Sequence, residues 1–433
     1  MGGNTSGGQD TGQSSSNGIY FGWFIVAATT ILTLLTIGMR LGIGPFFLPM
    51  TNDLGLTRSQ LSSVIAVGMM VYGLAMPLAG YLVSAWGTRK VLLAGAVLVL
   101  IAVGWTVVAR SELSLMLSFG ALLSVGLAFT SPVSVTPVIS RWFVRQRGMA
   151  LFCLSAGSMA GIAILTPVFT WGIQTFGWRE TLLGFAVLFA IASVPTALFV
   201  IREDAPEHAD TLAGALVQAN KPGVRPIVNN APSLKLREAI RTTPFWQLTF
   251  GLFACGFSMN LLGTHGMPML MDHGFDAGTS SFGIALIGIV AIFSSLALGR
   301  LSDIVERRNI LMAIYIVRGL GFFALVEVMS PWQLYTVAAI GGIVWAGSVA
   351  ISSAIMADVY GVRLVGVLYG WAYVGHQIGG TLSSWLGGWA YDTFHTHLIS
   401  FGAAGTLLLA AAATASQLPL RGMTLMGRAP AAG

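Results

Sequence analysis

The first long apolar segment of the chain contains a single charged residue. It begins near Phe21 and closes with the stretch Thr36-Ile37-Gly38-Met39-Arg40-Leu41-Gly42-Ile43-Gly44-Pro45-Phe46-Phe47-Leu48-Pro49. A continuous helix from Phe21 to Pro49 would be about 42 Å long and could cross the roughly 30 Å hydrocarbon core with tilt. Arg40 would then lie inside the membrane, where a guanidinium costs at least about 3 kcal/mol. We therefore expect an anionic substrate as its partner.

The composition of the chain is that of a membrane protein. Of the 433 residues, 55% are hydrophobic and only 9% are charged, whereas a soluble domain carries about 25% charged residues. The net charge of +6 could suit a nucleic-acid binder, but the basic residues form short clusters between apolar segments, so no nucleic acid is expected. Cys153 and Cys255 both lie in apolar segments. We therefore predict no disulfide framework, metal site or cofactor.

Twelve apolar segments are long enough to cross a membrane, at about 21–49, 60–84, 90–109, 113–139, 148–173 and 181–201, then 245–271, 281–301, 309–329, 332–357, 364–390 and 398–418. This predicts an all-α membrane protein with twelve transmembrane helices in two pseudo-symmetric six-helix bundles, 21–201 and 245–418. Residues 1–20 are expected to be a disordered tail, 202–244 a polar linker, and 419–433 a second tail.

Lys and Arg are unevenly divided between the two sides of the predicted membrane. Twelve spans put both termini and the linker on one side, which carries most of the Lys and Arg, whereas the other side has only Arg58, Arg110 and Arg179. Because cytoplasmic loops are enriched in Lys and Arg, we expect both termini and the linker to be cytoplasmic. The protein is expected in a cell inner membrane, embedded in the lipid bilayer, as a monomer.

The two halves of the chain repeat one another. A shift of 219 residues pairs Pro49 with Pro268, and it also pairs Asp53 with Asp272. Parallel repeats of six spans are typical of transporters that hold the substrate between two rocking bundles.

Two loops carry a related pattern, one running from Gly80 to Lys90 and the other from Gly299 to Arg308. They resemble the gating-loop motif of the major facilitator superfamily, in which Gly, three residues and Asp precede a Gly followed by basic residues. Ser84 replaces the Asp in the first loop, and Glu306 replaces the second Gly in the other. The resemblance spans residues 21–418 and implies a gating role for Gly80, Arg89, Gly299, Asp303, Arg307 and Arg308.

A narrower resemblance is to the monocarboxylate-transporter branch, which includes oxalate/formate exchangers. It rests on Phe21-Gly22-Trp23 and on the run 141–150, Arg-Trp-Phe-Val-Arg-Gln-Arg-Gly-Met-Ala. In that branch a basic residue shortly before a Phe-Phe pair binds the substrate carboxylate, and Arg40 precedes Phe46-Phe47 similarly. Animal members carry an Asp/Arg pair in the eighth span, which residues 281–298 lack, so their mode of proton coupling is not implied here.

No Asp or Glu lies deep in any predicted span, so a positive cavity that receives an anion is expected. The planar donors of Arg40 suit bidentate capture of a carboxylate; the alternative is that they bond carbonyls at a helix break near Gly42. Arg318 is expected to bond carbonyls or polar groups within the second half, with direct contact to the substrate as the alternative. Further candidate substrate contacts are Tyr72, Asn260, His265, Tyr369, Tyr373 and His376.

His265 and His376 are the internal groups that could exchange a proton near neutral pH. The alternative for each is a neutral histidine bonded to a carbonyl. We expect a secondary active transporter that moves a small organic anion, above all a monocarboxylate, by alternating access. Proton symport is one option for its coupling. We do not expect an enzyme. The rival functions are an efflux pump for hydrophobic or drug-like compounds and a transporter-fold sensor that binds without flux.

Overall fold

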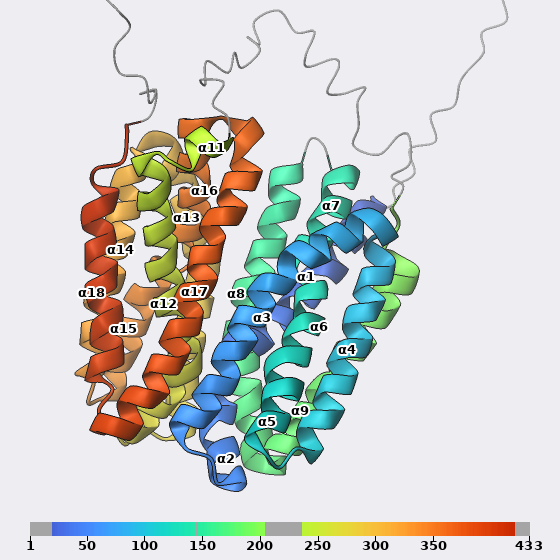
Figure 1. Cartoon of the computed structure of the whole chain (residues 1–433), viewed down its shortest axis with the longest axis vertical. Coiled ribbons are helices and arrows are strands. Elements are labelled where there is room, and N and C mark those ends of the chain that lie inside the picture. The colour runs from blue at the N-terminus through green and yellow to red at the C-terminus, as the bar shows by residue number, and fades with distance from the viewer. Residues whose placement is uncertain (1–19, 144–145, 204–235, 421–433) are drawn as a thin grey trace, which may run out of the picture.

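The computed structural model describes residues 20–143, 146–203 and 236–420, and within them all regular structure is helical (Figure 1). The predicted tails 1–20 and 419–433 lie outside these residues except for Tyr20, Pro419 and Leu420, and residues 204–235 of the predicted linker 202–244 also lie outside them. The face at which the helix from Phe21 begins is called the linker face here, because the chain between the halves also leaves from it; the opposite one is the far face.

The first half lies on the right in Figure 1 and the second half on the left. The first half comprises α1 (Phe21–Leu41), α2 (Gly44–Leu54), α3 (Arg58–Trp86), α4 (Thr88–Val108), α5 (Glu112–Leu115), the π-helix η1 (Met116–Leu122), α6 (Leu123–Phe129), α7 (Pro132–Trp142), α8 (Arg147–Phe176), α9 (Trp178–Pro195) and the π-helix η2 (Thr196–Val200). The second comprises α11 (Leu236–Ala239), α12 (Thr243–Asp272), α13 (Ala277–Ile304), α14 (Arg307–Val326), α15 (Pro331–Ile343), α16 (Gly347–Tyr360), α17 (Val362–Phe394) and α18 (Leu398–Ala415).

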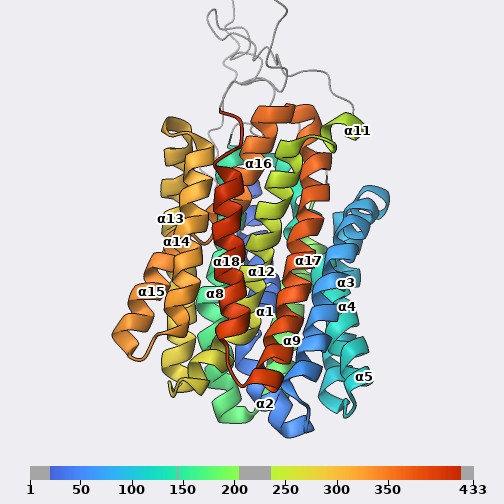
Figure 2. The same ribbon diagram turned by 60° about the vertical axis from the view of Figure 1, so that its left-hand side comes forward.

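Each half has its own apolar core, with α3 and α17 packed side by side where the halves meet (Figure 2). Among the described residues, eleven helical segments are long and apolar enough to cross a membrane. Helix α17, the eleventh predicted span, is not among them, although its 33 residues would reach about 50 Å. This helix carries the polar residues Tyr373, His376 and Gln377 into the interior.

The predicted continuous helix from Phe21 to Pro49 is wrong, because the chain breaks at Gly42 and Ile43. Helix α1 ends at Leu41, and Pro45 occupies the first turn of α2. Proline has no N–H to continue the ladder, and its ring clashes with the carbonyl four residues earlier. The break leaves Arg40 at the last turn of α1, at the middle of the span.

The tenth predicted span is also interrupted, between α15 and α16, and Arg318 of α14 fills the break. The Nη2 atom of this buried arginine donates to the carbonyls of Val344 (2.6 Å) and Trp345. Its Nη1 contacts the sulfur of Cys255 at 3.3 Å. The arginine therefore bonds the carbonyls that the end of α15 leaves without helical partners.

Replacing Arg318 should destabilise the protein. In Arg318→Met the two carbonyls lose a charged donor inside an apolar interior, and we expect the free energy of unfolding to fall by about 3 kcal/mol. The measurement is the thermal denaturation of the purified protein in detergent. The control is Arg308→Met, because Arg308 bonds a single, half-buried carbonyl, that of Leu418; equal losses in the two variants would contradict the capping role.

Candidate functional site

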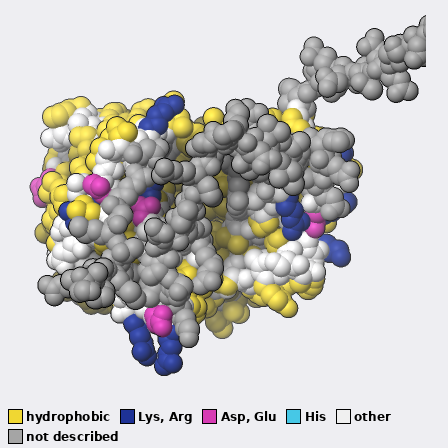
Figure 3. All heavy atoms as spheres, turned by 90° about the horizontal axis from the view of Figure 1, so that it is seen from above, with side chains coloured by type: hydrophobic (Ala, Val, Ile, Leu, Met, Phe, Trp, Pro, Cys, Tyr) yellow, Lys and Arg dark blue, Asp and Glu magenta, His cyan; other side chains and the backbone are white. Residues whose placement is uncertain are grey.

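A cavity of about 660 Å³ lies between the two halves. Its walls come from α1, α3, α7 and α8 on one side and from α12, α16 and α17 on the other. It reaches toward the linker face, because Gly80 near the end of α3 and Gly366 near the start of α17 both line it. Figure 3 looks onto that face and shows apolar side chains receding between the two lobes.

On the far face the two halves are in direct contact. A Cβ atom on Gly44 of α2 would lie 3.0 Å from the carbonyl oxygen of Gly263 in α12, and one on Gly388 of α17 would lie 2.1 Å from Ser62 Oγ in α3. Glycine is therefore required for the backbones to approach this closely. The cavity is closed on the far side and extends toward the linker face.

Arg40 lies at the inner end of the cavity and joins the two halves. Its Nη2 atom donates to Gln377 Oε1 of α17 at 2.9 Å, and it lies 3.4 Å from Asn260 Oδ1 of α12 and 3.5 Å from Met69 Sδ of α3. The guanidinium also sits 4.2 Å from the ring centroid of Tyr72, a cation–π contact. Carbonyls at the break near Gly42, the alternative considered from sequence, are not among these partners.

No carboxylate among the described residues balances the charge of Arg40. None of the ion pairs among the described residues includes this arginine. Within the same part of the chain, its Nε is buried without a hydrogen-bond partner, and Nη2 is the atom that donates its hydrogen bonds. The guanidinium beside the cavity thus has N–H donors without a partner in the described part of the chain.

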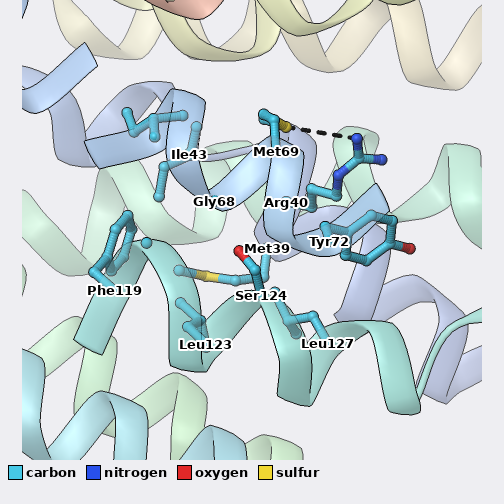
Figure 4. A pocket seen from close by; sticks show the side chains of 12 residues that line it. Met39, Arg40, Ile43, Gly68, Met69, Tyr72, Phe119, Leu123, Ser124 and Leu127 are labelled. Carbon is cyan, nitrogen blue, oxygen red and sulfur yellow. Dashed lines mark hydrogen bonds between the residues drawn. The ribbon is translucent and has the colours of Figure 1, made fainter. Parts of the chain in front are cut away.

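A second, smaller cavity of about 40 Å³ adjoins Arg40 on the side of the first half. Figure 4 shows it between Arg40, Met69 and Tyr72 on one side and Phe119, Leu123 and Ser124 on the other. The π-helix η1 contributes Phe119, so an irregular turn forms part of its wall. Its volume corresponds to about three water-sized groups.

His376 shares the cavity wall with two of the predicted tyrosines. Its ring stacks on that of Tyr373 with 4.6 Å between centroids, and the ring centroid of Tyr369, one turn earlier in α17, lies 5.8 Å from that of Tyr373. All three line the large cavity, as does Tyr72 from the other half. His376 is buried, and neither ring nitrogen has a hydrogen-bond partner among the described residues. It can therefore offer a donor to a bound solute.

His265 has different surroundings. It does not line the large cavity; its Nε2 lies 2.8 Å from the carbonyl oxygen of Ser384, and its ring packs against Phe47 at 5.0 Å. This is the geometry of the alternative considered from sequence, a buried histidine bonded to a carbonyl. The two histidines, for which the sequence suggested the same roles, thus have different surroundings in the structure.

The arginines of the second gating loop are bonded within their own half. Arg307 donates to both carboxylate oxygens of Asp358 at 2.7 and 2.8 Å, and Arg308 donates to the carbonyl of Leu418 at 3.0 Å.

The other predicted gating residues lie at the linker-face ends of helices. Gly80 lines the cavity, Arg89 is exposed at the start of α4, and Gly299 has open space around it. The side chain of Asp303 lies outside the described residues. A gating role for these loops stays a prediction.

The sequence interpretation missed Gln377, the nearest partner of Arg40. Its amide lies next to His376 in the eleventh span, and a polar residue at that depth was a usable signal. It went unnoticed because glutamine carries no charge. The partnership itself depends on two residues that are 337 positions apart in the chain.

The chain is similar to known transporters over most of its length. It is 24% identical over 385 residues to "Uncharacterized MFS-type transporter YcxA" of Bacillus subtilis (strain 168), covering 87% of this chain and 90% of that protein. It is 26% identical over 414 residues to human "Monocarboxylate transporter 11", covering 90% and 81%.

Among solved structures, a bacterial homolog to the human lysosomal transporter Spinster, in an inward-facing and occupied conformation, superposes with a TM-score of 0.62 at 17% identity. The match covers 92% of this chain and 97% of that one. The family model described as Major Facilitator Superfamily matches residues 27–328 and 267–422. The chain therefore belongs to the Major Facilitator Superfamily and is a multi-pass membrane transporter.

Proposed function

We propose that this protein moves a small organic anion across the membrane by alternating access, and that monocarboxylates are the leading class of substrate. The observation that carries the proposal is the charge of Arg40, which lies beside the cavity without a carboxylate among the described residues. A buried cation of this kind is costly unless an anion joins it. Similarity to human and bovine proteins named monocarboxylate transporters supports the same class of solute.

The linker face is proposed to be cytoplasmic, since the Lys and Arg residues favour that side. The described conformation then faces inward. His376 and the tyrosines of α17 offer polar contacts opposite Arg40, while Met76, Met159 and Val349 supply apolar surface for the rest of the solute.

Capture of a carboxylate requires a rearrangement of the amides around Arg40. A guanidinium has two forked edges, Nη1–Nη2 and Nη2–Nε, so bidentate capture uses Nη2 in either case. The two N–H groups of Nη2 are shared among Gln377, Asn260 and Met69. An incoming carboxylate therefore displaces at least one of them, and Gln377 is the closest competitor.

Removing the charge of Arg40 should abolish transport. In Arg40→Gln the cavity loses its cation, and we expect uptake of radiolabelled short-chain carboxylates into proteoliposomes to fall by about 100-fold, with Arg40→Ala behaving alike. Thermal-shift screening across acetate, propionate, lactate, pyruvate, oxalate and formate identifies the ligand in wild type. Full transport by a correctly inserted Arg40→Gln variant would refute the proposal.

Gln377 is expected to compete with the solute for Arg40. In Gln377→Ala, Nη2 loses its shortest hydrogen bond, and the affinity for the carboxylate found in the screen should rise by about fivefold, which corresponds to about 1 kcal/mol. Isothermal titration measures the change. The matched control is Thr381→Ala, one turn further along α17, because its hydroxyl bonds only the backbone carbonyl of residue 377. Weaker binding in Gln377→Ala would instead make the amide a solute contact.

Protonation of His376 should strengthen anion binding. A protonated His376 adds a second positive charge to the cavity, so proton and anion binding reinforce each other, as symport requires. We expect the affinity of wild type for the carboxylate to rise as the pH falls from 8 to 6, and His376→Gln to remove this slope. His265→Gln, outside the cavity, should keep it; a slope lost only in His265→Gln would move the role to that residue.

A second candidate function is efflux of hydrophobic compounds, which the volume and apolar surface of the cavity favour. Lipophilic cations and neutral compounds would then raise the melting temperature more than carboxylates do. A sensor is separated from both by the flux measurement, because it binds its ligand without moving it.

A further inference from the structure

An ion pair closes the far face between the two halves. Arg58, the first residue of α3, donates to Asp272 at the end of α12 through Nη1 (2.5 Å to Oδ2) and Nη2 (2.9 Å to Oδ1). Of the ion pairs among the described residues, this one alone joins the halves. Bidentate pairs of this kind are strong and geometrically specific, so opening of the far face must break it.

Two neighbouring contacts strengthen the same junction. The backbone N–H of Ser59 donates to Asp392 Oδ2 at 2.6 Å, and the guanidinium of Arg58 lies 3.8 Å from the ring centroid of Tyr391. Both contacts join α3 of the first half to α17 of the second, next to the ion pair between α3 and α12. We call Arg58, Asp272 and His397 the far-face latch.

The carboxylate of Asp272 is shared with a histidine of its own half. His397, which precedes α18, lies with Nε2 2.8 Å from Asp272 Oδ2. A carboxylate is an acceptor, so this nitrogen carries the hydrogen. The other ring nitrogen, Nδ1, is buried and has no partner in the described part of the chain. A second proton on this ring would therefore be unpaired while the latch is closed.

We propose that His397 is a proton-binding site that controls the far-face gate, and that its protonation favours opening. While His397 is neutral, Arg58 alone balances the charge of Asp272, and the halves stay together. When His397 is protonated, Asp272 has a positive partner within its own half, and separation from Arg58 costs less. The protonated ring also repels Arg58 in the closed latch.

The linkage works in both directions. The closed latch disfavours the second proton on His397 relative to the open latch, because Arg58 is adjacent and Nδ1 has no partner among the described residues. The open latch binds it more tightly, because Asp272 remains and Arg58 has left. Acidification within the range where histidines titrate, about pH 5 to 8, therefore shifts the protein toward the conformation open at the far face.

The other charged or titratable groups near the latch do not replace His397 in this role. The ring of His273 lies 6.4 Å from that of His397, and burial lowers the pKa of His273 below its usual value. Tyr391 contacts the His397 ring at 4.6 Å. The remaining ionisable groups in the surroundings of His397, His273 and Tyr391 are Asp272, Arg58, His265, Glu327, Asp392 and His395.

The first half provides a natural comparison. Asp53 corresponds to Asp272 under the 219-residue repeat, and it pairs with Arg179 at 2.6 Å. Both of these residues belong to the first half, so the pair spans no junction. The same carboxylate position is thus structural in one half and a latch in the other.

The test measures the far-face distance without any solute, so it does not depend on the proposed substrate. Nitroxide labels on Asn52→Cys and Thr393→Cys, both exposed at the far face, are introduced in a Cys153→Ser, Cys255→Ala background. Double electron–electron resonance in proteoliposomes reports the distance at pH 8 and pH 5.5. We expect the ratio of long to short distances to rise by about tenfold at the lower pH, the effect of losing one charged hydrogen-bond pair.

Three variants identify the group responsible. His397→Gln keeps a donor for Asp272 but takes no charge, so the ratio should stay low at both pH values. Asp272→Asn should raise the ratio at both, and Asp53→Asn should respond to pH as wild type does.

Two results would overturn the proposal: distances in wild type that do not change with pH, or an unchanged pH response in His397→Gln. Should Asp272→Asn fail to fold, the comparison of wild type with His397→Gln decides alone. If Arg40→Gln loses transport but the wild-type distances do not change with pH, the proposed anion transport stands and the proposed gating role of His397 does not.

Discussion

A guanidinium in a membrane interior needs partners, and the kind of partner decides what the residue can do. The described part of this protein has two such arginines, Arg40 and Arg318. Arg318 donates to the carbonyls of Val344 and Trp345, which belong to a fixed helix end. Arg40 donates to the side-chain amide of Gln377 across the boundary between the halves. Backbone carbonyls stay in place, whereas an amide side chain can rotate away, so the first arginine stabilises the fold and the second remains available.

Interrupted helices make both arrangements possible. The break after Leu41 puts Arg40 at a helix end beside the cavity, and the break after Ile343 exposes the carbonyls that Arg318 requires. In a lipid environment non-helical backbone is tolerated only where protein or a water-filled cavity surrounds it. Each break lies in such a place, because Arg40 and Ala346, next to the two breaks, both line the cavity.

The cavity and the far-face latch lie at opposite ends of the same junction. Helices α3 and α17 meet beside the cavity, where a Cβ atom on Gly73 would lie 2.8 Å from Gln377 Cγ, and they meet again on the far face around Gly388 and Ser62. Glycines allow backbone contact there, and the ion pair of Arg58 with Asp272 adds a charged connection. A junction of this kind can close at one end while it is open at the other, which alternating access requires.

The local pattern of residues was sufficient to predict the membrane class, the helical architecture and the membership of the superfamily, because hydropathy and short loop motifs depend on neighbouring residues. It also identified Arg40, since a lone charge in an apolar segment is visible without any structure. It failed where distant segments determine the outcome: the amide of Gln377 against Arg40, and the different surroundings of His265 and His376. Whether a buried polar group is satisfied depends on atoms hundreds of positions away, and only the packing of the two halves brings those atoms together.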